Sequence, residues 1–173
     1  MRSAFTIGFL ALIGPAVASA GAATCGVDLQ VRFIEGAPVD RFVISNGSDQ
    51  TYPLSEVAFD LSASAGRLIF DTQNGGAGVE VFQPFQSSIA DINVRDGATG
   101  LRIPMDGLAA GTEVSFTIDV DDQLTASELG QIRVSGSEMS GAQVVFAMNG
   151  QPFLATFNAQ NIARITPKCD DNA

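Results

Sequence analysis

The segment EVSFTIDVDD, residues 113–122, alternates polar and apolar side chains from Glu113 to Asp121. The apolar side chains occupy every second position and are those of Val114, Phe116, Ile118 and Val120. This period of two is typical of a β-strand with one face in the core and the other in water. Asp119 and Asp121 fall on the polar face, and Asp122 follows where the alternation ends. The segment therefore predicts a core strand that ends in three carboxylates.

The same alternation recurs through most of the chain, for example at residues 79–85, 91–95, 131–137 and 142–148. Asn149-Gly150 separates two alternating runs, and this pair suits the positive φ angles of a type I′ hairpin turn. Only residues 123–130 offer a place for a helical turn, because Thr125 and Glu128 have the spacing of a capping box.

Nine or ten short strands with turn residues between them predict an all-β fold with at most one short helical turn. The expected architecture is an immunoglobulin-like antiparallel β-sandwich. Twelve phenylalanines are expected to fill its interior, since the chain has no tryptophan. No repeat or linker divides the sequence, so residues 21–173 are expected to form a single domain.

Residues 1–20 have the features of a secretory signal peptide. Arg2 supplies a positive start, an apolar run covers residues 5–17, and Ala18-Ser19-Ala20 is a cleavage site of small residues. The apolar run is shorter than the ~20 residues that a membrane span requires. We therefore expect an exported protein, periplasmic or extracellular, with no membrane span after signal cleavage.

The chain has two cysteines, Cys25 and Cys169, near the two ends of the expected mature protein. An even pair in an oxidising compartment most simply forms a disulfide. The chain-entropy model gives such a long loop a stabilisation of ~4 to 5 kcal/mol. A redox or metal site is disfavoured, because the pair lacks C-x-x-C spacing and the chain has no histidine.

The chain is strongly acidic, with nineteen acidic residues against nine basic ones and a formal net charge of −10. Nucleic acids and anionic membrane surfaces are bound through clusters of lysine and arginine, so the composition argues against both partners. The acidity is explained either by solubility outside the cell or by affinity for cations.

The carboxylates at the end of the segment 113–122 are candidate calcium ligands. Asp119 and Asp121 lie about 7 Å apart along one strand face, and a glycine-rich loop at residues 74–78 could meet them. Calcium takes about six to eight oxygen ligands. The candidates for that site are Asp71, Asn74, Asp119, Asp121 and Asp122. The alternative interpretation is a solvated strand end that binds no ion.

Catalysis is not expected. The chain has no histidine, and its only lysine, Lys168, stands beside Cys169. Carboxylates at Asp60, Asp71 or Glu80 leave a glycoside-type hydrolase as a third hypothesis, but acidic residues on a strand face normally face water. Aromatic platforms for sugars are also scarce, with one tyrosine and no tryptophan.

Three passages carry a resemblance to a known family: LIFDT at residues 68–72, GVEVFQPF at 78–85 and FTIDVDD at 116–122. Together they resemble small exported bacterial proteins labelled aggregation factor core protein, while GLAAGTEVSFTIDV at 107–120 resembles immunoglobulin-like modules. The resemblance implies an extracellular adhesion or matrix role and brings no catalytic motif.

The expected function is thus a non-catalytic interaction or adhesion module, with calcium as a possible stabilising ion. Its partner is expected to be a protein or an extracellular polymer. The alternative is a periplasmic binding or accessory subunit of a larger envelope assembly.

Overall fold

Eleven strands and one helical turn make up the described part of the chain, residues 27–36 and 39–165 of a computed structural model. The elements are β1 (Leu29–Ile34), β2 (Arg41–Asn46), β3 (Leu54–Asp60), β4 (Ile69–Asp71), β5 (Gln86–Ser87), β6 (Gly100–Pro104), β7 (Glu113–Thr117), β8 (Asp119–Asp121), α1 (Gly136–Met139), β9 (Gln143–Met148), β10 (Gln151–Thr156) and β11 (Ile162–Ile165). The predicted all-β fold is confirmed. The expected signal peptide and the two cysteines, Cys25 and Cys169, lie outside the described residues.

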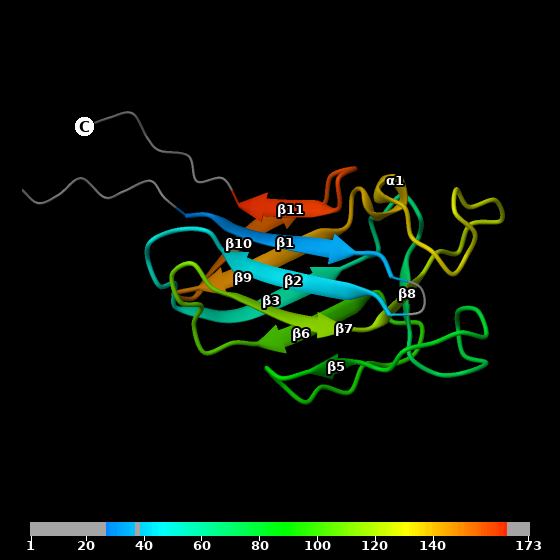
Figure 1. Cartoon of the computed structure of the whole chain (residues 1–173), viewed down its shortest axis with the longest axis horizontal. Helices are drawn as coiled ribbons and strands as arrows, with labels where there is room; N and C mark the ends of the chain where they lie inside the picture. Colours follow the sequence, from blue (N-terminus) through cyan, green and yellow to red (C-terminus); the bar gives the residue numbers. More distant parts are fainter. Residues whose placement is uncertain (1–26, 37–38, 166–173) are drawn as a thin grey trace, which may run out of the picture.

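The strands form two main sheets that face each other (Figure 1). One sheet has five strands in the order β11-β1-β2-β7-β5, and the other has four in the order β10-β9-β3-β6. A third, two-stranded sheet pairs β4 with β8 at one end of the sandwich (Figure 1). Every pair of neighbouring strands is antiparallel. The part of the chain that the structure describes has no helix long and apolar enough to cross a membrane.

Phenylalanine rings fill the space between the two main sheets, as the composition predicts. Phe42 on β2 lies at their centre, with its ring 5.0 Å from those of Phe33 and Phe116 and 5.1 Å from that of Phe59. Phe42 is fully buried and contacts rings from both sheets, so it joins the two layers. Aromatic pairs at these separations add about 0.5–1.5 kcal/mol beyond the area they bury.

The predicted strand at residues 113–122 is divided in the structure. Its first half is β7, which pairs with β2, and its second half is β8, which pairs with β4. Ile118 stands between them, and its N–H donates to the Asp40 carbonyl at 3.2 Å. The division changes the environment of the acidic residues: Asp119 and Asp121 are 3% and 1% exposed. Their predicted place on a wet strand face was wrong.

Four other local predictions were wrong. Residues 123–130 form no helix, because the capping box that is used lies later, where Ser135 and Glu138 begin α1. Residues 79–85 and 91–95 are irregular, as is most of 131–137, since these loops pack at the end of the sandwich beside β4 and β8. The Asn149-Gly150 hairpin is confirmed, with φ angles of 50° and 74° between β9 and β10.

Candidate metal centre

Three aspartates meet where β4 pairs with β8. Asp71 is the direct partner of Asp119 in the antiparallel register, and Asp121 lies opposite Ile69, two positions further along. Side chains at i and i+2 of a strand share a face, so all three carboxylates point to the same side. One oxygen from each carboxylate lies within 4.8 Å of the other two. The pairing of two short strands thus brings together residues that are nearly fifty positions apart in the sequence.

Each of these aspartates has one buried oxygen that accepts no hydrogen bond from an N–H or O–H group. These atoms are Asp71 Oδ2, Asp119 Oδ2 and Asp121 Oδ1. The residues themselves are almost completely buried, at 0%, 3% and 1% exposure. An unpaired buried polar group costs about 1–3 kcal/mol, and a charged one costs more. The arrangement is therefore unfavourable unless protons or a cation occupy the space between the oxygens.

Electrostatics at the cluster disfavour three negative charges. Burial raises the pKa of the Asp119 carboxyl to about 8, and the charge of Asp121 adds to the effect. Burial also raises the pKa of Asp71 to about 6. The pKa of Asp121 is raised by burial as well, although a hydrogen bond from the Val79 N–H, at 2.9 Å, opposes the shift. A bound cation would relieve the same repulsion that these pKa shifts report.

The glycine-rich loop after β4 covers the three carboxylates. Asp96 fixes this loop by accepting hydrogen bonds from the Thr72 N–H at 3.0 Å and the Ala77 N–H at 2.7 Å. Gly78 then packs directly on the cluster: a Cβ atom there would collide with Asp121 Oδ2 and lie 2.6 Å from Asp71 Oδ2. Only glycine fits so close to the carboxylates, so the loop forms a tight cover over them.

The other two predicted ligands lie outside this group. Asn74 is exposed at the outer part of the covering loop. Asp122 is buried, and its Oδ1 accepts a hydrogen bond from the Leu124 N–H at 2.9 Å, while its Oδ2 has no donor. Asp122 lines a separate hollow of about 360 Å³ beside Gly78. The centre therefore contains three of the five candidates: Asp71, Asp119 and Asp121.

Asp40 is a neighbour of the centre that sequence reasoning missed. It is 2% exposed, and its Oδ2 accepts a hydrogen bond from the N–H of Val120, which lies between two of the ligands. Burial, together with the charge of Glu35, raises the pKa of Asp40 to about 7. A single aspartate before a strand has no spacing that would reveal this contact. Asp40 contacts Val120 only because β8 leaves the sheet of β7 and pairs with β4.

The donor set suits a hard cation. Three carboxylates and no histidine or cysteine match the ligands that calcium, magnesium and manganese take. Calcium–oxygen bonds of about 2.3–2.6 Å place two ligand atoms of one ion at most about 5 Å apart, which agrees with the 4.8 Å limit on the triad. The remaining ligands of such an ion would come from outside the three carboxylates.

The chain matches no family model, no curated protein and no solved structure.

Proposed function

We propose that the protein is an exported, non-catalytic interaction or adhesion module whose β-sandwich is stabilised by one calcium ion held by Asp71, Asp119 and Asp121. The observation that carries the proposal is the set of buried carboxylate oxygens that lack a hydrogen-bond donor. Structural ions are a common way to compensate such a cluster, because a divalent cation neutralises carboxylates that burial would otherwise protonate.

A structural role for the ion follows from its surroundings. All three aspartates are buried, and the loop fixed by Asp96 covers them, with Gly78 in contact. A catalytic ion needs an open coordination position that a substrate can reach. A covered ion instead joins β4 and the loop that follows it to β8, which lies nearly fifty residues further along the chain. The centre would thus order one end of the sandwich.

The export and interaction parts of the proposal rest on the sequence. The signal peptide at residues 1–20 supports export, and millimolar calcium outside the cell would be sufficient to load a site of modest affinity. The absence of histidine from the whole chain and the resemblance to aggregation factor core proteins support a role without catalysis. A module of this kind would act through its surface, with the ion fixing the loops at one end.

Thermal unfolding with calcium and with a chelator tests the proposal. For a dissociation constant near 10 µM, calcium at about 1 mM adds about 2.7 kcal/mol of stability. For a chain of this length that is a rise in Tm of about 5–10 °C. Magnesium at the same concentration is expected to give a smaller rise, since it prefers a smaller, octahedral site. A calcium-induced shift below about one degree would exclude the site.

A matched pair of variants assigns the effect to the triad. Asp119→Asn keeps the shape of the side chain but removes a charged ligand, so we expect the calcium-induced shift to disappear. In chelator this variant should be at least as stable as the natural protein, because the folded state no longer has to keep this side chain protonated. The control is Asp106→Asn, at an exposed aspartate in the turn between β6 and β7, which should retain the full calcium effect.

A further inference from the structure

The turn at residues 96–99 joins two extended segments that do not pair with each other. Residues 91–95 precede it and alternate in burial, with Ile92 and Val94 packed against the core, yet these described residues belong to no strand. β6 follows the turn and lies at the edge of its sheet, where β3 is its neighbour. An alternating segment and an edge strand joined by a short turn normally form a hairpin. Here the two arms of the hairpin stand apart.

Contacts with β4 and the residue after it hold this hairpin open. The Phe70 N–H donates to the Ala98 carbonyl in the turn, and the Gly97 N–H donates to the Phe70 carbonyl, both at 2.9 Å. The Thr72 hydroxyl donates to the Val94 carbonyl at 3.4 Å. These bonds fix the turn and the first arm to the β4 segment, so the first arm is not free to close on β6.

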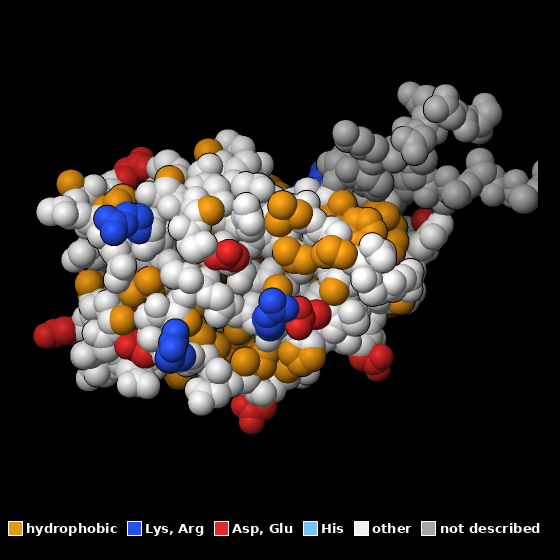
Figure 2. Space-filling view, turned by 180° about the vertical axis from the view of Figure 1, so that it is seen from behind, with side chains coloured by type: hydrophobic (Ala, Val, Ile, Leu, Met, Phe, Trp, Pro, Cys, Tyr) orange, Lys and Arg blue, Asp and Glu red, His pale blue; other side chains and the backbone are white. Residues whose placement is uncertain are grey.

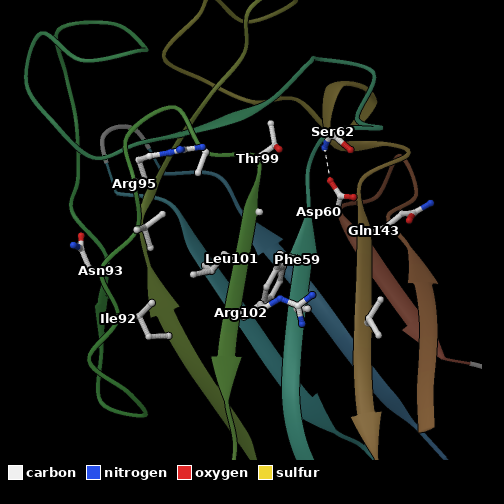
Figure 3. A pocket seen from close by; sticks show the side chains of 15 residues that line it. Phe59, Asp60, Ser62, Ile92, Asn93, Arg95, Thr99, Leu101, Arg102 and Gln143 are labelled. Atoms are coloured by element: carbon white, nitrogen blue, oxygen red, sulfur yellow. Dashed lines mark hydrogen bonds between the residues drawn. The ribbon is translucent and has the colours of Figure 1, made fainter.

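Both arms line a hollow of about 910 Å³, which is within the range of about 300–1,000 Å³ that ligand sites occupy. Figure 3 shows Ile92 and Asn93 on one side of β6 and Phe59 on the other. The buried side chains of Phe59, Val94 and Leu101 are among the lining residues, so the hollow reaches the interior of the sandwich at the sheet edge. Figure 2 looks onto the outer face of this sheet and shows hydrophobic side chains at the surface along its lower edge, near two basic ones.

The edge of β6 that borders the hollow carries backbone groups that pair with none of the described strands. The Leu61 N–H donates to the Thr99 carbonyl at 2.8 Å, so the odd-numbered residues of this segment bond to β3. The backbone groups of Gly100, Arg102 and Pro104 therefore point to the free edge. Hydrogen-bonding groups at every second residue of an extended chain match the backbone of another strand. The ligand that this edge fits is thus an extended polypeptide.

We propose that the open hairpin binds an extended segment of a partner protein, which adds to β6 as a new antiparallel edge strand. One face of the segment would cover Phe59 and Leu101, so every second side chain should be apolar. The other face would lie in water beside two arginines that line the hollow. Arg102 is paired with Glu56 at 2.6 Å, but Arg95 is exposed and forms no ion pair with any described residue. Acidic side chains on the outer face of the segment therefore suit the site.

The contact is expected to be short and weak. β6 offers outward backbone groups at three positions, and Pro104 has no N–H to donate. A proline on an edge strand limits unwanted pairing, so this edge is open to a short segment only. Two donors and three acceptors correspond to a dissociation constant of about 100 µM. This inference rests on the proposed interaction role and names the kind of partner that the module would bind.

Binding of a synthetic peptide to the protein in calcium tests the inference. The probe is a capped seven-residue peptide with valine at its second, fourth and sixth positions, glutamate at the third and fifth, and threonine at both ends. In an antiparallel pair the glutamates lie opposite Gly100 and Arg102, so the amides of these two residues should exchange more slowly with solvent when the peptide binds. Lysine in place of glutamate should weaken binding about fivefold. N-methylation of both glutamates should abolish binding, since their N–H groups face β6.

Two substitutions at Arg102 separate the backbone group from the side chain. Arg102→Ala and Arg102→Pro both remove the guanidinium, but only proline removes the N–H at the free edge, where Pro104 shows that the strand accepts proline. We expect Arg102→Ala to bind the peptide within about fivefold of the natural protein and Arg102→Pro about tenfold more weakly than Arg102→Ala. If Arg102→Pro does not fold, the N-methylated peptide decides the same question.

Two results would overturn the inference: no binding of the valine–glutamate peptide at about 1 mM, or equal binding by the two Arg102 variants and by the N-methylated peptide. Self-association of the protein through β6, lost in Arg102→Pro, would also overturn it by showing that the occupant is a second copy. The calcium-induced rise in Tm is measured on the same samples. Its persistence would show that the ion site stands even where strand addition fails.

Discussion

Two buried acidic sites in this protein differ in how their oxygens are satisfied. Glu138 at the start of α1 is 5% exposed, and both its carboxylate oxygens accept hydrogen bonds: Oε1 from the Glu128 N–H at 3.0 Å and Oε2 from the Ser135 N–H at 2.7 Å. Asp71, Asp119 and Asp121 are buried to a similar extent, but each keeps an oxygen without a donor.

The difference shows that burial of a carboxylate does not by itself indicate an ion. Both oxygens of Glu138 are satisfied within the protein, because the capping box supplies the Ser135 N–H and the preceding loop supplies the Glu128 N–H. The triad lies on two paired strands whose N–H groups are used elsewhere: that of Phe70 donates to the Ala98 carbonyl, that of Asp119 to the Gln83 carbonyl and that of Val120 to Asp40. Few donors therefore remain for the three carboxylates. A buried acidic site is a candidate for binding a cation when its oxygens lack hydrogen-bond donors. The two sites should therefore respond differently to calcium.

The largest expected effect is a dependence of stability on pH that calcium removes. Folding raises the pKa of Asp119 to about 8, of Asp40 to about 7 and of Asp71 to about 6, from ordinary values near 3.8. Between about pH 4 and pH 8 the folded, cation-free protein therefore holds protons that the unfolded chain has released. Its stability falls as pH rises through this window, by up to about 1.4 kcal/mol per pH unit for each proton held.

Melting curves at pH 5 and pH 8, in chelator and in calcium, check this prediction. In chelator the Tm should be higher at pH 5. Calcium favours the ionised triad and competes with the protons, so the fall in Tm toward pH 8 should shrink or reverse. Identical pH profiles with and without calcium would contradict a cation site at the triad.

The sequence predicted the layers of this fold better than its metal centre. Alternation reports which face of a strand is buried, and it identified β9 because this strand lies between β10 and β3 in a regular sheet. It failed at residues 113–122, where the chain leaves one sheet for another at Ile118 while the alternation continues.

The triad was only partly accessible to the same reasoning. The proximity of three carboxylates at one strand end indicated a cation, and Asp71 was included because a glycine-rich loop follows it. Their burial, the contact of Gly78 and the role of Asp96 depend on the pairing of β4 with β8 and on the position of the loop, which no local pattern encodes. Long-range strand pairing is set by the whole fold and leaves little trace in short segments.

An intermediate effect is expected for Gly78→Ala. The added methyl group would collide with Asp121 Oδ2, so either the covering loop or the carboxylates must shift. Overpacking of this kind costs about 1–3 kcal/mol, and displacement of the ligands should also reduce the calcium-induced rise in Tm. Gly100→Ala is a suitable control: its nearest neighbour would be the Phe59 carbonyl oxygen at 3.8 Å. Unchanged calcium stabilisation in Gly78→Ala would show that this glycine does not cover the ion.

The smallest expected effect is that of Ser135→Ala at the satisfied acidic site. The Ser135 hydroxyl accepts a hydrogen bond from the Glu138 N–H at 3.2 Å, and its removal breaks one half of the capping box. Loss of such a cap costs about 1 kcal/mol. The cost should be the same in calcium and in chelator, because Glu138 keeps its own donors and no ion takes part. Ser88→Ala, at an exposed serine, is the control, and no change in stability is expected for it. If calcium protected the protein against Ser135→Ala, the two acidic sites would be coupled, and the contrast between a complete site and one that needs a cation would no longer hold.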